Sequence, residues 1–571
     1  MTVRPRFKYR IHNAPSFHAL DQAARVGSNM AIVYSLGPCS HLTFNKDPVS
    51  GRLMDEFPIY FDDYPRIAEL RRSADAVWLE PLRRHVRAMC DRAKALGMKP
   101  VLHLYEPMLP LAFEREYPEL VGVFKRPTQE GTIDVHTHMN PDNPATWALM
   151  RSKYRELARD FPDVALFIIT TGDTASSYWC VPEAKMPVYK RLASMIQSAR
   201  DGVREVRKDA QVCCRLWWRN WPEEYYRDGH RMTEELTGLR NATDYLCRIG
   251  KPHNDPSVVL PKLFKELPRD VPVMYKSTRM DIHDNSPLTH VLGKYPKGRE
   301  QIIEVSFELY HLTDWPWCKI KHIRQGYQAA CDYKLAGYVS LPINMQNNER
   351  DIDPETGNLG RMNTWLLERL VQGDKRSDSA LVGAWLEKEF GAPQPEVVAR
   401  ALIDADRLAS EGIQWGRGIN NRRPFGSLHD AKIYWMYDGF IQPDFPYRIA
   451  SPTAEFLESL IAMKHAAYDQ TCEHIAGLEA AGPAMSPRLF EEIHPAYVNF
   501  ANFMLLVRDW SSYLLMQYGI EKQVFPADRK TLGRMSRYAE TFIRNMVRLK
   551  DTPAGKRAMA SLAFPDNFPL T

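Results

Sequence analysis

The sequence predicts a (β/α)8 barrel followed by an all-helical domain, an α/β fold class with an α-helical addition. Two patterns lead to this prediction. Short apolar runs alternate with amphipathic helical stretches up to about residue 375, and beyond it helical periodicity continues while strand-like runs almost vanish. Strands that alternate with helices at this spacing indicate βαβ units and a parallel sheet. The predicted domains are therefore a catalytic barrel over residues 1–375 and a helical domain over 376–571.

Eight apolar runs in the first region have the length and composition of strands, and long helical segments at 75–96 and 184–208 lie between them. The predicted strands cover residues 29–34, 99–105, 164–170, 211–217, 243–247, 271–275, 302–307 and 337–341. Eight such units suit a (β/α)8 barrel with insertions. The alternative is a doubly wound open sheet, but nothing like a GxGxxG loop opens a helix in this sequence.

The second region shows helical periodicity between joints marked by proline and glycine. The predicted helices cover 378–390, 394–412, 452–480, 487–519 and 528–550, and the joints lie at Gly391-Ala392-Pro393, Gly482-Pro483 and Phe525-Pro526. This pattern indicates helices that pack on one another and on the barrel.

Composition excludes several classes of protein. A chain of 571 residues exceeds what one core needs, and its net charge of +5 includes no run of five Lys or Arg, so we expect neither a nucleic-acid nor a membrane partner. No stretch of about 18 apolar residues occurs. Residues 1–10 lack the apolar core of a signal peptide, which favours a cytoplasmic location; a periplasmic one stays open because a removed signal leaves no trace. The nine Cys are scattered without a CxxC pair, as expected of small buried side chains.

Polar residues follow or end most of the predicted barrel strands, at the end where barrel enzymes place their active sites. These residues are Glu106, Asp173, Arg215, Lys276, Asp281, Glu304, Glu308 and Asn344. Several carboxylates at one mouth fit acid/base chemistry on a glycosidic bond. A single carboxylate at a strand end is structural about as often as it is catalytic, so the prediction depends on the whole set of polar residues.

The strand around residues 302–307 places two carboxylates on one face. Glu304 and Glu308 share a face by the period of two, while Val305 and Phe307 form the opposite, apolar face. We expect the apolar face to be buried under helices and both Glu side chains to point into the barrel. The alternative turns the Glu side chains outward, where Lys or Arg would pair with them.

Four segments resemble the barrel and C-terminal domain of family 67 α-glucuronidases, over about residues 5–480. They are residues 143–170, 199–215, 276–304 and 359–387. In that family an Arg that matches Arg215 and a Lys that matches Lys276 bind the uronate carboxylate, and an Asp that matches Asp281 is a candidate catalytic base. A strict alignment puts Thr174 at the catalytic acid and Tyr310 at the second base, so the nearest carboxyl groups, Asp173 and Glu308, take those roles.

The resemblance implies an exo-acting, inverting glycoside hydrolase that releases a uronic acid such as glucuronic acid from oligo- or polysaccharides. Asp173 would protonate the leaving oxygen, and Asp281 or Glu308 would activate water on the opposite face of the sugar. Arg215 and Lys276 would bind the carboxylate, although an ion pair inside the barrel is the other interpretation of Arg215. Further substrate contacts are predicted for Glu106, Glu304, Asn344 and Trp217, the last by stacking on a sugar face. No metal or cofactor is required; the expected partner is an oligosaccharide, and the resemblance suggests a homodimer through the helical domain.

Other functions stay open at this point. A glycosidase for a neutral sugar fits the same carboxylates. His136-Thr137-His138 resembles the HxH metal pair of amidohydrolase barrels, which would make the chain a metal-dependent hydrolase. In that superfamily, however, the pair lies on the first strand, whereas here it follows two or three βα units. A non-catalytic sugar-binding protein and a uronate-specific polysaccharide lyase complete the set.

Overall fold

A computed structural model shows how these segments fold. It describes residues 7–14, 16–36, 57–73, 79–107, 109–110, 112–127, 133–171, 184–216, 256–276, 288, 292–293, 298–306, 316, 318–341, 360–413, 428 and 445–556.

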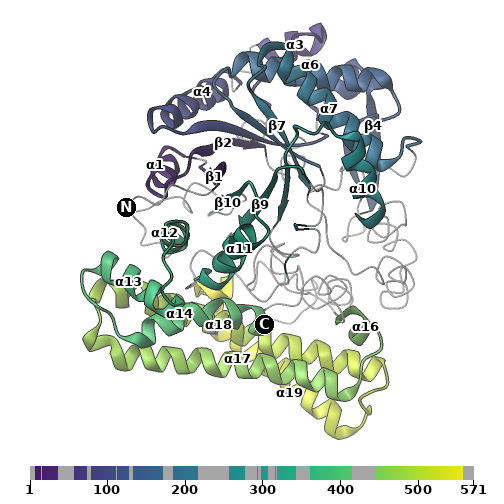
Figure 1. Cartoon of the computed structure of the whole chain (residues 1–571). Helices are drawn as coiled ribbons and strands as arrows, with labels where there is room; N and C mark the ends of the chain where they lie inside the picture. Colours follow the sequence, from purple (N-terminus) through teal and green to yellow (C-terminus); the bar gives the residue numbers. More distant parts are fainter. Residues whose placement is uncertain are drawn as a thin grey trace.

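Eight parallel strands close into a barrel in the order β1-β10-β9-β8-β7-β6-β3-β2 (Figure 1). The strands are β1 (Tyr9–Asn13), β2 (Met30–Leu36), β3 (Lys99–Tyr105), β6 (Leu166–Thr170), β7 (Gln211–Leu216), β8 (Val273–Lys276), β9 (Gln301–Ser306) and β10 (Gly337–Leu341). This arrangement confirms the predicted fold class.

One barrel strand was not predicted, and one predicted strand falls on residues that the structure does not describe. The strand predicted at 243–247 lies outside the described residues. Strand β1 was not predicted, because its five residues, YRIHN, offer only Tyr9 and Ile11 as an apolar alternation. It nevertheless closes the barrel by pairing with β10 on one side and β2 on the other.

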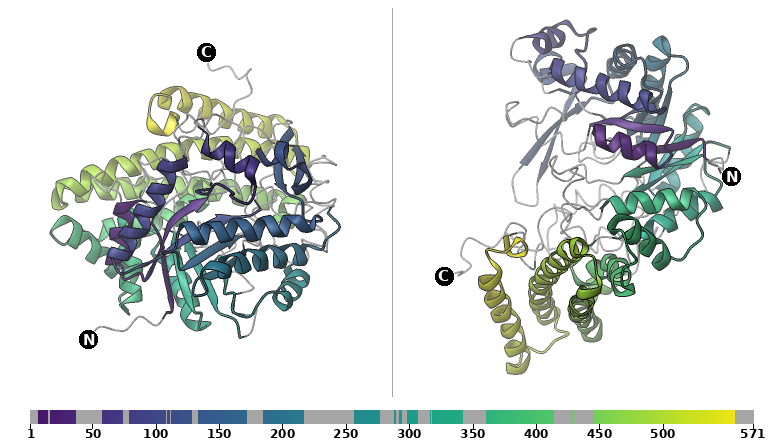
Figure 2. Two further views of the ribbon diagram at one scale, coloured as in Figure 1. Left: turned by 90° about the horizontal axis from the view of Figure 1, so that it is seen from above. Right: turned by 90° about the vertical axis from the view of Figure 1, so that its left-hand side faces the viewer.

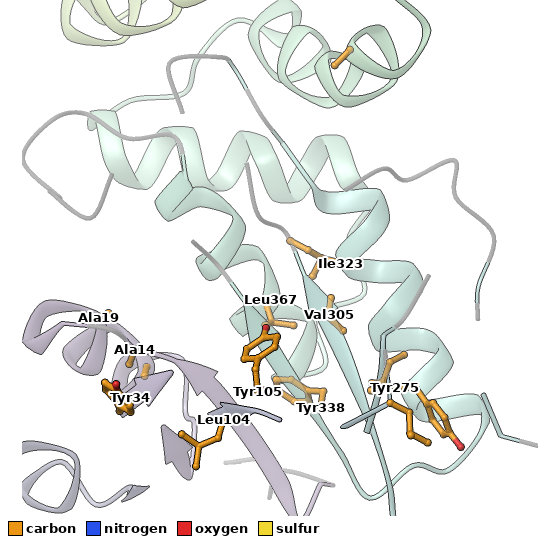
Figure 3. Packing of buried hydrophobic residues seen from close by; sticks show 14 of the residues in the cluster. Ala14, Ala19, Tyr34, Leu104, Tyr105, Tyr275, Val305, Ile323, Tyr338 and Leu367 are labelled. Atoms are coloured by element: carbon orange, nitrogen blue, oxygen red, sulfur yellow. The ribbon is translucent and has the colours of Figure 1, made fainter. Parts of the chain in front are cut away.

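The period of two along each strand separates two apolar clusters. Inward side chains fill the barrel: Tyr9, Ile11, Met30, Ile32, Val101, Leu166, Ile168, Cys213, Met274, Ile302 and Val339. Outward side chains join the large cluster under the surrounding helices, and Figure 3 shows Val305 of β9 beside Ile323 of the helix that follows it. The barrel interior is thus packed rather than hollow.

Helices connect and cover the strands. They are α1 (Phe17–Arg25), α3 (Pro65–Arg72), α4 (Leu79–Ala95), α5 (Ala112–Glu116), α6 (Pro144–Asp160), α7 (Val188–Val206), α10 (Pro256–Glu266), α11 (Ile320–Asp332) and α12 (Gly360–Val371). Asn143 starts α6 by accepting a hydrogen bond from the Ala145 amide, 3.0 Å away, as its side chain is suited to do. Gly202 lets α7 approach α6, since a Cβ there would lie 2.1 Å from the Arg151 carbonyl oxygen.

A separate hairpin follows β3. Strands β4 (Val121–Pro127) and β5 (Ile133–Met139) pair with each other in antiparallel fashion and take no part in the barrel. His136 and His138 belong to β5, so the HxH pair does not lie on a barrel strand as it does in amidohydrolases.

Beyond α12 the described chain is helical, as predicted. The helices are α13 (Asp378–Phe390), α14 (Glu396–Gly412), α16 (Phe445–Ala450), α17 (Ala454–Ala481), α18 (Pro487–Glu521) and α19 (Arg529–Leu549). Figures 1 and 2 show them as a layer beside the barrel, with α11 and α12 in between. The boundary predicted at 375/376 falls between α12 and α13, although the division into two domains stays a prediction. Among the described helices, none has both the length and the apolar character needed to cross a bilayer.

A buried ion pair joins the barrel to this helical layer. Lys319, directly before α11, pairs with Asp406 of α14, and both side chains are almost fully buried. The Lys319 amide also donates to the Asn363 side chain of α12 at 2.7 Å. Because α11 begins after β9, the contact fixes the helical layer near the carboxyl end of that strand.

We expect the removal of one partner of the Lys319–Asp406 pair to destabilise the protein more than the removal of both. Asp406→Ala removes this carboxylate from a buried ammonium and is expected to lower the free energy of unfolding by roughly 3–5 kcal/mol, whereas the apolar double change Lys319→Met with Asp406→Leu costs far less. Denaturant unfolding measures both. The control is Arg324→Ala, which breaks the more exposed pair with Asp378 and is expected to cost about 1 kcal/mol or less. A loss of that small size in Asp406→Ala would contradict the role given to the buried pair.

Candidate active site

A polar layer caps the apolar interior at the carboxyl end of the barrel. On six of the eight strands, the inward position two residues after a member of the inner cluster is polar instead of apolar. All six residues are buried: Asn13 on β1, and His103, Thr170, Arg215, Lys276 and Glu304, which contact one another. This is the end at which barrel enzymes bind and convert substrates.

Arg215 and Glu304 form the centre of this layer. Nη2 of Arg215 donates to Oε1 of Glu304 at 2.7 Å, Nε donates to the other carboxylate oxygen, and both side chains are only 1% exposed. Nζ of Lys276 lies 3.9 Å from the same carboxylate, with 8% of its side chain exposed. Burial opposes ionisation of Glu304, but the charges of Arg215 and Lys276 outweigh it and hold the pKa of the carboxyl group below its usual range.

Hydrogen bonds extend this centre across neighbouring strands. Nη1 of Arg215 donates to Oγ1 of Thr170 at 3.1 Å, and Oγ1 lies 2.7 Å from Nε2 of His103. Nδ1 of His103 in turn lies 3.2 Å from Oγ of Ser35 on β2. With Lys276, the network runs without a gap over β9, β8, β7, β6, β3 and β2, which are consecutive strands of the barrel.

His103 serves this network as a neutral imidazole. Burial, aided by the nearby charge of Arg215, lowers the pKa of His103 to about 3. The hydroxyl groups of Thr170 and Ser35 can each donate or accept, so the one hydrogen of a neutral imidazole satisfies both contacts of His103. A neutral histidine adds no charge beside the two cations of the layer.

The structure decides between the two orientations considered for Glu304. The side chain points into the barrel, as the alternation along its strand predicted, because Ile302 belongs to the inner cluster while Ile303 and Val305 belong to the outer one. The ion pair considered for Arg215 is also present, so its guanidinium contacts Glu304 and Thr170. The substrate contacts of Arg215, Lys276 and Glu304 stay predictions.

Glu106 lies outside this layer. It follows β3, but its carboxylate turns to α6, where Nζ of Lys153 is 2.8 Å and the hydroxyl of Tyr154 is 2.9 Å away. Lys153 and Glu106 are fully buried, and the ammonium also lies 3.5 Å from the centroid of the Phe57 ring. Glu106 therefore ties the end of β3 to a surrounding helix, and its predicted contact with substrate is untested. Lys153 lies on the apolar face of α6, four residues from both Leu149 and Leu157, a pattern from which a buried partner could have been inferred.

The other predicted site residues lie outside the described residues, so their roles stay predictions. In sequence, each comes shortly after a barrel strand: Trp217 after β7, Asp173 after β6, Asp281 after β8, Glu308 after β9 and Asn344 after β10. Sequence reasoning missed His103, Thr170 and Ser35. The first two continue the inward alternation of Val101 and Ile168, which is the signal that could have identified them.

Among the residues that the structure describes, no group of three or more His, Cys, Asp or Glu side chains is arranged to hold a metal ion. The side chains of His136 and His138 are not among those described.

Comparisons with known proteins support the architecture. No family model matches the sequence, and no curated protein does. Among solved structures, a GH138 enzyme targeting pectin rhamnogalacturonan II aligns over 97% of this chain and 78% of its own, with a TM-score of 0.61 and 11% identity. A family 89 glycoside hydrolase from Clostridium perfringens, solved with PUGNAc, aligns over 98% of this chain and 57% of its own, with a TM-score of 0.46 and 13% identity. At such identities, the likeness to the GH138 enzyme shows a shared fold. The chain thus has the barrel-and-helix fold of a solved glycoside hydrolase.

Buried neutral histidines make the stability of the protein depend on pH. Burial lowers the pKa of His12 to about 4, while its Nδ1 lies 2.6 Å from Oγ of Ser340, and His103 behaves similarly. Below about pH 6.5 the unfolded chain binds protons that the folded chain does not, so stability falls as the pH decreases.

We expect each of the two histidines to lower the free energy of unfolding by roughly 2 kcal/mol between about pH 7.5 and about pH 5. Denaturant unfolding at the two pH values measures the loss, and His12→Gln is expected to reduce its size. An equal loss of unfolding free energy between the two pH values in the variant and the wild type would show that His12 does not titrate in this way.

Proposed function

We propose that this chain is an exo-acting glycoside hydrolase that releases a uronic acid from an oligosaccharide at the carboxyl end of the barrel. The main support is the buried charged layer of Arg215, Lys276 and Glu304 at that end. Carbohydrate chemistry is further supported by the fold, which is shared with a solved glycoside hydrolase.

The charges of the layer favour an acidic sugar. Two cations, Arg215 and Lys276, surround one carboxylate, and His103 is neutral. A sugar carboxylate brings a second negative charge to this low-dielectric region, where charges interact strongly. Lys276 is the more exposed of the two cations, and its ammonium acts as a compact point charge, so we assign it the first contact with the carboxylate. Arg215, held by Glu304, then supplies fixed positive charge behind it.

The proposed mechanism is inversion with two carboxyl groups. Asp173 donates a proton to the leaving oxygen, and Asp281 or Glu308 removes a proton from the attacking water on the opposite face. In sequence, Asp173 follows β6, whereas the base candidates follow β8 and β9, and β7 separates these strands in the barrel. Strand β7, which carries Arg215, thus lies between the strand that precedes the acid in sequence and the strands that precede the base candidates, an order that is compatible with an acid and a base on opposite faces of one sugar.

A neutral sugar is the second candidate substrate. All three guanidinium nitrogens of Arg215 take part in hydrogen bonds to Glu304 and Thr170. An arginine engaged in this way is a weaker clamp for a second carboxylate, which favours a substrate that offers hydroxyl groups instead.

A panel of uronic-acid-bearing and neutral oligosaccharides separates the two candidates. We expect the wild type to release a uronic acid, Asp281→Asn to be slower by ~100-fold or more, and Lys276→Met to raise KM for the acidic substrate. Chromatography of released monosaccharide measures all three. Release of a neutral sugar alone would replace the uronate by the second candidate, and no release across a broad panel would refute the hydrolase.

A further inference from the structure

One amide at the barrel mouth has no role in the site described above. Asn13, the last residue of β1, is only 1% exposed, and its Nδ2 has no hydrogen-bond partner among the residues that the structure describes. Buried amide groups in folded proteins almost always have a partner, and a missing one costs roughly 1–3 kcal/mol. A donor buried at this position therefore needs an explanation.

The position of Asn13 in the strand directs its side chain into the barrel. Tyr9 and Ile11, at the two preceding positions of the same face, both belong to the inner cluster, and so does Ile32, the register partner of Asn13 on β2. Asn13 comes next in this alternation and lies where β1 ends, at the carboxyl end of the barrel. Its neighbour His12 faces the other way and pairs with Ser340.

The order of the strands places Asn13 opposite the charged centre. In the eight-strand ring, β7 is four strands away from β1 in either direction, so Arg215 and Asn13 lie on opposite walls of the mouth. The polar network covers the strands from β9 round to β2 and leaves β1 outside it. Asn13 supplies hydrogen-bond donors on the wall that the network does not reach.

We propose that Asn13 is a substrate-contacting residue whose amide donates a hydrogen bond to a hydroxyl or ring oxygen of the bound sugar. This inference rests on the proposed function. The sugar lies across the mouth, with an anionic or hydroxyl-rich edge toward Arg215 and Lys276 and a hydrogen-bond acceptor toward Asn13. Binding of the sugar supplies the acceptor that the amide lacks, so the interaction contributes to affinity while adding nothing to the stability of the free protein.

This role predicts that removing the Asn13 amide weakens sugar binding without lowering the stability of the free protein. Asn13→Leu, which keeps the volume and removes the polar atoms, is expected to leave the free energy of unfolding unchanged or higher, because no hydrogen bond is lost. The same variant is expected to bind sugar roughly 5- to 100-fold more weakly. The matched control is Asn363→Leu, which removes the acceptor of the Lys319 amide and is expected to lower stability without weakening sugar binding.

The experiment combines denaturant unfolding, titration with D-glucuronic acid and with D-glucose, and kcat/KM on the best substrate of the panel, for wild type, Asn13→Leu and Asn363→Leu. Weaker binding at unchanged stability supports the inference, even if the wild type hydrolyses nothing, in which case only the proposed function fails. Unchanged binding and kcat/KM in Asn13→Leu overturn the inference while an active wild type keeps the proposed function. A loss of stability in Asn13→Leu that equals that of Asn363→Leu also overturns it, because Asn13 would then be structural. Absence of both sugar binding and hydrolysis by the wild type refutes both.

Discussion

The barrel mouth depends on one buried ion pair, Arg215 with Glu304. Removing two charges from water is expensive, and the attraction between them offsets this only when the remaining hydrogen-bonding groups are satisfied. Here the carboxylate receives two hydrogen bonds from one guanidinium, and the third guanidinium nitrogen reaches Thr170. The pair joins β7 to β9 across β8, the strand that carries Lys276, so one contact connects side chains from the ends of neighbouring strands.

The surrounding structure follows from this constraint. Because Arg215 and Lys276 already place two cations beside the one carboxylate of Glu304, a third cation there would be unfavourable, and the neutral His103 between Thr170 and Ser35 adds none. Outside the barrel, a second buried pair between Glu106 and Lys153 holds the end of β3 against α6. A third, between Lys319 and Asp406, holds the helical layer near the end of β9. Ion pairs thus fix the carboxyl end of the barrel on several sides, whereas apolar packing fills its interior.

Periodicity in the sequence predicted the fold class and most of the barrel strands. The helix predicted at 378–390 has those bounds in the structure, and the inward direction of Glu304 followed from the apolar residues that alternate with it. The missed strand β1 is short and contains charged and polar residues, so its place depends on pairing with β10, a contact between distant parts of the chain. The contacts between the site residues could not be predicted from the sequence either. Which carboxylate meets Arg215 depends on the order and stagger of the strands around the closed barrel, and the outward turn of Glu106 depends on the path of the chain after β3.

A double-mutant cycle on Arg215 and Glu304 tests the central claim most directly. Arg215→Met and Glu304→Leu, alone and together, are compared with the wild type in denaturant unfolding and in sugar binding. If the pair organises the mouth, each single variant loses roughly 3–5 kcal/mol of stability, the double variant recovers most of it, and none of the three binds sugar as the wild type does. Additive losses of stability, or a double variant that binds sugar normally, would contradict the account.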